Sequence, residues 1–178
     1  MVAVRIGSLG LAILLLAGCT TRSAGVEQRM ILPVGAQRHE MADHQAFVFP
    51  APDGNQPPDF PKGYAPSELP PTTLCASLVV ERDGSVRDVA LLDDPQCASA
   101  AQAPALAAAV TAALADWRFY PALLCTYPDA ATRERDWTPS ACTGGASEAR
   151  AVAVTLAYAF TFEVRQGRRR VGAARMER

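Results

Sequence analysis

Apolar and polar residues alternate in two stretches of the chain. From Leu74 to Val80 every second residue is apolar, in a segment that begins at about residue 72. A period of two predicts a strand that buries one face. Residues 151–164 alternate bulky side chains with small or polar ones, over a longer stretch than the usual strand length of about 3–10 residues. We therefore predict two strands, the second of them unusually long.

A turn and a returning strand follow the first of these strands. Asp83-Gly84 is a dipeptide that tolerates the positive φ of a tight hairpin turn. Residues 86–92 are then the expected second strand of a hairpin. The apolar parity changes within this strand, which predicts a β-bulge near Arg87 and Asp88.

An alanine-rich stretch between the hairpin and the long strand has a helical period. Apolar residues recur on one face between Pro104 and Trp117, alanine favours helix, and proline suits a first helical turn. The pattern therefore predicts an α+β fold in which one helix packs on a face of a small antiparallel sheet. The expected core contains apolar residues of the helix and aromatic residues that follow it: Leu106, Val110, Leu114, Trp117 and Phe119.

The region before the predicted domain shows no sustained period. Residues 20–71 contain nine of the 14 prolines, and proline lacks the N–H that a helix interior needs. We interpret residues 19–71 as an extended tether and residues 72–164 as the domain. The tail, residues 165–178, contains six arginines and one acid. A solvated end is the favoured interpretation, and contact with anionic lipid head groups or glycan strands is the alternative.

The N-terminus is typical of an export signal. A positive charge at Arg5 precedes a short apolar run that ends in Leu16-Ala17-Gly18-Cys19. The run is shorter than the roughly 20 residues that a membrane-spanning helix needs, and its end resembles a bacterial lipobox. The resemblance implies a signal peptide at residues 1–18 and a lipid anchor on Cys19. In lipoproteins of this kind, Asp directly after the cysteine favours retention at the inner membrane, and this chain has Thr20 there, which resembles lipoproteins of the outer membrane. The alternative is an ordinary signal peptide in which the cysteine carries no lipid.

Five cysteines leave an even number if Cys19 carries lipid. The remaining four predict disulfides in an oxidising compartment, and four cysteines permit three connectivities. We favour Cys75 with Cys97 and Cys125 with Cys142. The second bridge would close a long loop at about residues 124–150, which is either a decoration or a second contact surface anchored by Trp137.

Composition argues against several functions. A formal net charge of −1 gives no basic field for nucleic acid. The two histidines, His39 and His44, are spaced one residue too far apart for a zinc-binding HExxH helix and lie in the expected tether. The sequence contains no glycine-rich loop of the kind that binds phosphate. We therefore expect no enzyme activity, no cofactor and no metal site.

The order of predicted elements resembles the TonB C-terminal domain family. The resemblance is carried by residues 80–86, Val-Glu-Arg-Asp-Gly-Ser-Val, by the helix, by residues 117–122, Trp-Arg-Phe-Tyr-Pro-Ala, and by the lead-in Pro58-Asp59-Phe60-Pro61. It covers roughly residues 58–164. It implies a sheet of order 2-1-3, in which the first predicted strand is central and the final strand lies at an edge.

The resemblance also implies a function. Members of the family bind another chain by strand addition at the outer edge of the final strand. We therefore expect an outer-membrane lipoprotein, facing the periplasm, that binds another protein and is linked to TonB-type transport. The expected partner is either an outer-membrane transporter or an envelope complex. The expected edge consists of Val152, Val154, Thr155, Leu156, Tyr158, Phe160, Thr161 and Phe162. The alternative is a scaffold lipoprotein that forms a homodimer or contacts peptidoglycan.

Overall fold

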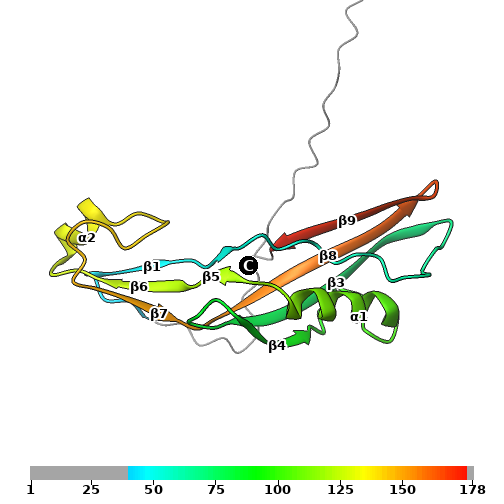
Figure 1. Cartoon of the computed structure of the whole chain (residues 1–178), viewed down its shortest axis with the longest axis horizontal. Helices are drawn as coiled ribbons and strands as arrows, with labels where there is room; N and C mark the ends of the chain where they lie inside the picture. The colour runs from blue at the N-terminus through cyan, green and yellow to red at the C-terminus, as the bar shows by residue number, and fades with distance from the viewer. Residues whose placement is uncertain (1–39, 176–178) are drawn as a thin grey trace, which may run out of the picture.

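The computed structural model describes residues 40–175 of the chain. The expected signal peptide and residues 19–39 of the expected tether, which include Cys19 and His39, lie outside these residues. The described part is an α+β fold with antiparallel sheets and two helices. Figure 1 shows an elongated molecule with a larger sheet at one end and a smaller sheet at the other.

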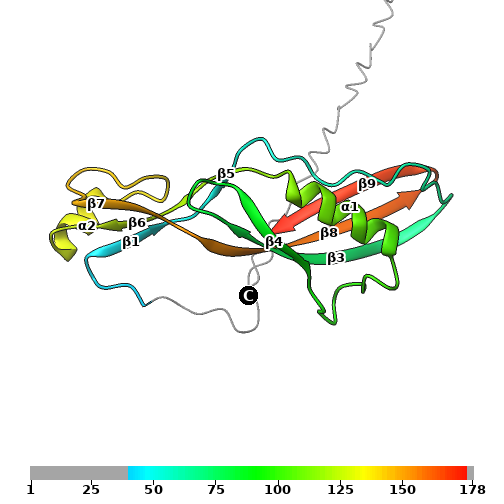
Figure 2. The same cartoon turned by 60° about the horizontal axis from the view of Figure 1, so that its bottom comes forward.

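The larger sheet has four strands in the order β4-β3-β8-β9. Its strands are β3 (Leu69–Val80), β4 (Val86–Leu91), β8 (Val154–Arg165) and β9 (Arg168–Arg175), and all neighbours are antiparallel. Helix α1 (Pro104–Ala115) covers one face of this sheet (Figure 2). The expected three-stranded order was incomplete, because the chain adds a fourth strand beyond β8.

The core lies between α1 and the sheet. All five residues expected there, Leu106, Val110, Leu114, Trp117 and Phe119, are buried. The Trp117 ring meets the Tyr158 ring edge to face at 5.0 Å, and it lies 6.1 Å from the Phe119 ring. These contacts connect the end of the helix to β8.

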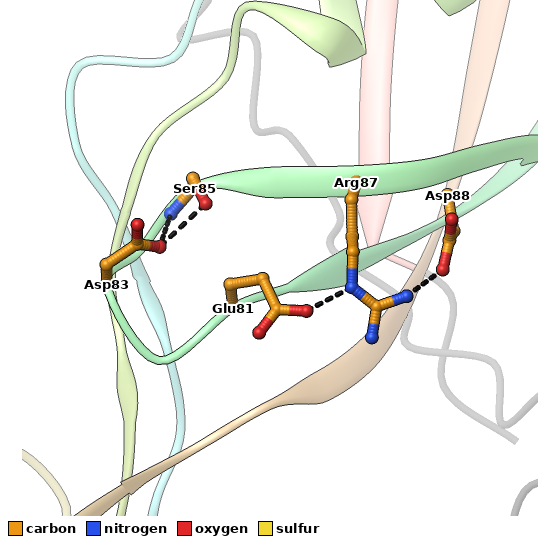
Figure 3. Close-up of polar contacts among 5 residues, drawn as sticks. All are labelled: Glu81, Asp83, Ser85, Arg87 and Asp88. Atoms are coloured by element: carbon orange, nitrogen blue, oxygen red, sulfur yellow. Dashed lines mark hydrogen bonds and ion pairs between the residues drawn. The ribbon is translucent and has the colours of Figure 1, made fainter.

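The turn between β3 and β4 is stabilised by its own polar groups (Figure 3). Asp83 accepts hydrogen bonds from the Ser85 hydroxyl at 2.6 Å and the Ser85 N–H at 2.9 Å, and these bonds lower the pKa of Asp83. Gly84 has φ +82°. The register with β3 then slips beside Asp88, which has φ +52°, so the predicted bulge is confirmed. Arg87 forms ion pairs with both Glu81 and Asp88.

The smaller sheet has the order β1-β6-β7. Its strands are β1 (Gln45–Val48), β6 (Ala122–Thr126) and β7 (Glu148–Val152). A short helix, α2 (Ala130–Asp136), lies between β6 and β7. The side chains of Ala46, Val48, Cys125 and Tyr127 form a second buried cluster. The inserted loop expected at residues 124–150 is therefore largely ordered secondary structure.

Both favoured disulfides are present. Cys75 and Cys97 have Cα atoms 5.7 Å apart, and Cys125 and Cys142 have Cα atoms 5.4 Å apart. The second bridge connects β6 to the segment after α2. It covers the small cluster where few other apolar side chains are available.

The long strand predicted at residues 151–164 belongs to both sheets. β7 pairs with β6, β8 pairs with β3, and only Ala153 separates them. This division explains why the alternation runs longer than an ordinary strand.

The prediction of an extended tether is wrong for the described residues before β3. β1 lies in the smaller sheet, and β2 (Ala51–Pro52) pairs with β5 (Phe119–Tyr120). The Trp117 indole N–H also donates to the Gln56 carbonyl oxygen at 2.9 Å. Pro58 is fully buried. Prolines occur here because these short strands and loops need few backbone donors.

Candidate interaction edge

The structure contradicts the second half of the predicted partner-binding edge, from Tyr158 to Phe162. β9 pairs with β8 from Tyr158, opposite Arg175, to Arg165, opposite Arg168. Tyr158, Phe160, Thr161 and Phe162 therefore have β3 on one side and β9 on the other. The physical reason is that the arginine-rich tail satisfies the backbone groups of β8 within the same chain.

The other predicted edge residues have different positions. Val152 is the last residue of β7, whereas Val154, Thr155 and Leu156 begin β8 ahead of the residues that pair with β9. Leu156 is buried and Thr155 is exposed. The predicted residues thus do not form one continuous open rim.

A two-residue turn reverses the chain between β8 and β9. Gln166 has φ +51° and Gly167 has φ +69°, the pair of positive angles found in type I′ hairpins. The Gln166 N–H donates to the Glu68 carboxylate at 3.1 Å. Gly167 was the available sequence signal for this hairpin. It was missed because residues 168–175 contain one β-branched residue, Val171, among arginine, glycine and alanine.

The larger sheet ends in two different edge strands. β4 has six residues, a bulge and the ion-paired Arg87, all of which obstruct the addition of another strand. β9 has eight residues and pairs with β8 without a register shift. Among the described residues, β8 is the only strand paired with β9. The outer side of β9 is therefore the more regular edge.

The charges of β9 are distributed over both faces of the sheet. Arg170 lies opposite Glu163 on β8, and Arg168 lies opposite Arg165. Arg169 lies opposite Val164, on the same face as α1. These arginine side chains are exposed, so their charges contribute little to stability. They nevertheless give the edge a positive charge.

A hollow lies beside β9 on the face that carries α1. It is lined by Asp59, Phe60, Lys62, Arg169 and Val171 and has a volume of about 440 Å³. The Arg169 guanidinium lies 5.6 Å from the centre of the Phe60 ring. Phe60 in turn meets the buried Phe162 edge to face at 5.3 Å. Phe60 was predicted only as part of the family lead-in, and Lys62 and Arg169 were not predicted as site residues.

The described residues contain neither a metal-binding cluster nor a membrane-spanning helix. Residues 40–175 contain no group of three or more His, Cys, Asp or Glu side chains that could bind a metal. Within the same range, no helix has the length and apolar content to span a bilayer.

Comparison with protein-family models, curated proteins and solved structures gave no match to this chain. The similarity to the TonB C-terminal domain family therefore stays a prediction from residues 58–164.

Proposed function

We propose that this chain is a protein-binding module of the bacterial envelope that captures an extended segment of another protein by strand addition to β9. The observation that carries the proposal is the outer side of β9, a regular eight-residue edge that pairs with no other described strand. Unpaired N–H and C=O groups along such an edge favour a further strand. No catalytic activity is part of the proposal.

The charge of β9 favours a different chain over a second copy. Arg168, Arg169 and Arg170 are exposed and form the first three of the eight residues of β9. Two such strands placed edge to edge would bring like charges together, whereas an acidic segment would be attracted. Basic residues on an edge thus select among partners as well as limiting self-association.

The proposed location is the periplasmic side of the outer membrane, with the lipid on Cys19 as the anchor. The two disulfides support an oxidising compartment. The resemblance to the TonB C-terminal domain family supports a link to TonB-type transport. An anchored module of this kind would bind its partner close to the membrane surface.

Photo-crosslinking in intact cells tests the proposal. A photoreactive amino acid at Arg168 or Gly172 on β9 should capture a partner peptide, identified by mass spectrometry as one segment of one protein. The same group at Arg87, on the bulged β4 edge, is the matched control. Equal capture from both edges, or no capture from β9, would contradict strand addition at β9.

A scaffold role through a homodimer is the second candidate, and it is supported by a different surface. Phe49 is 54% exposed and Tyr120 is 63% exposed, and both lie where β1 and β2 meet β5 and β6. The Phe47 and Phe49 rings are 5.0 Å apart. A concentration-dependent dimer that Phe49→Ser abolishes would favour this role.

A further inference from the structure

We infer that the hollow beside β9 receives an acidic side chain from the added strand, bound between Arg169 and Lys62. The inference rests on the proposed strand addition and specifies the chemistry of the partner. On this inference, the face of the sheet that carries α1 determines which partner segment binds to β9. The partner segment would carry Asp or Glu at one position of an otherwise extended stretch.

Arg169 has no charge partner among the described residues. The neighbouring Arg170 lies opposite Glu163, whereas Arg169 lies opposite the apolar Val164. Among the described residues, no carboxylate lies within ion-pair distance of Arg169 or Lys62. Two cations at one hollow therefore remain available to an incoming anion.

The Arg169 guanidinium lies over the face of an aromatic ring. Its contact with the face of Phe60 restrains Arg169, and Phe60 is itself packed against Phe162 and stacked at 6.3 Å on Tyr64. A restrained guanidinium loses less side-chain entropy on binding a carboxylate and can donate two parallel hydrogen bonds. The contact with Phe60 thus holds the Arg169 guanidinium in an orientation that suits a planar anion such as a carboxylate.

Strand addition to β9 would bring side chains of the partner close to the hollow. A strand paired with β9 places side chains on the same face as Arg169 and Val171 about 4.5–5.5 Å away, measured between Cβ atoms. Those side chains would meet the hollow, which Asp59 and Lys62 border on the other side. The Asp59 carboxylate would repel further negative charge, so the hollow suits one acidic side chain rather than several.

Peptide binding to the full chain in detergent micelles tests the inference. The probes are an eight-residue threonine-rich peptide with one central Glu and the matched peptide with Gln. We expect the Glu peptide to bind about threefold to fivefold more tightly, the range of an exposed ion pair. Arg169→Gln should remove this preference, Arg170→Gln should leave it, and Asp59→Asn should increase it.

Amide hydrogen exchange of residues 168–175 separates the two proposals. Protection of these amides by both peptides, with no preference for Glu in the native chain, would overturn the acidic pocket and leave strand addition intact. A preference that survives Arg169→Gln and Lys62→Gln would overturn it as well. If neither peptide protects the amides, both proposals fail.

Discussion

Gly84 lies directly against the backbone of Phe119. The Phe119 N–H donates to the Gly84 carbonyl oxygen at 2.9 Å, and a Cβ on Gly84 would stand 1.9 Å from the Phe119 carbonyl oxygen. Ser85 also forms an isolated bridge with Arg118. The β3–β4 turn is thus joined to the segment that leaves α1, which explains why the two motifs occur together.

Replacement of Gly84 by alanine should destabilise the fold strongly. The new methyl group would both clash with fixed backbone and sit at φ +82°. We expect a loss of about 2–4 kcal/mol in the free energy of unfolding, measured with denaturant. Gly63→Ala is the control, because Gly63 has φ +77° but open space around it, and it should lose only about 1 kcal/mol. Equal losses would contradict the backbone clash.

The hydrogen bond from Trp117 to Gln56 should contribute measurably to stability. Trp117→Phe removes that donor from a buried site and leaves the carbonyl without it, so we expect a loss of about 2–3 kcal/mol and faster proteolysis near Gln56. Trp137→Phe is the comparison, because the buried Trp137 Nε1 has no hydrogen-bond partner in the described part of the chain. That variant should cost much less, and the opposite ranking would refute the role of Gln56.

The two disulfides should act on different parts of the molecule. Loops of 17 and 22 residues each predict about 3 kcal/mol from chain entropy. Replacement of Cys125 and Cys142 by alanine should expose the amides of β6 and β7 to fast hydrogen exchange, because the small cluster has little other apolar area. Replacement of Cys75 and Cys97 should lower overall stability and keep the α1 core folded. Uniform exchange in both variants would contradict this division.

Asp129 should make α2 sensitive to acid. Its carboxylate caps the helix by accepting from the Thr132 N–H at 2.7 Å, and this bond lowers the pKa of Asp129 below its ordinary 3.8. The stabilisation is complete above the unfolded-state pKa and disappears as pH falls through the lower folded-state pKa. The Thr132 amide shift should follow this change, and Asp129→Asn should remove the pH dependence while it keeps a cap. An unchanged titration in Asp129→Asn would refute the assignment.

Removal of β9 should uncover the edge of β8. A chain that ends at Arg165 loses the cover that Val171 and Ala173 give to the core beside Phe160. We expect lower stability and self-association, measured by light scattering, since a long apolar edge strand recruits other chains. A chain that ends at Arg175 is the control and should behave like the full protein. Monomeric behaviour of both would show that β9 is dispensable as a cover.

Several elements were predictable because their signals are local. The alternation from Leu74 to Val80 predicts β3, Asp83-Gly84 predicts the turn, and the parity change predicts the bulge at Asp88. The spacing of apolar residues around Val110 predicts the buried face of α1. In each case the decisive residues lie within a few positions of one another, so backbone geometry and burial of one face suffice.

Tertiary structure alone decided where the first and last strands of the described chain, β1 and β9, are placed. Residues 168–175 have little strand preference of their own, and they form β9 because β8 presents backbone groups and apolar side chains that need cover. β1 likewise pairs with β6, which lies more than 70 residues away in the chain. Such pairings depend on the assembled sheet and on the entropy of closing long loops, and no local pattern encodes either.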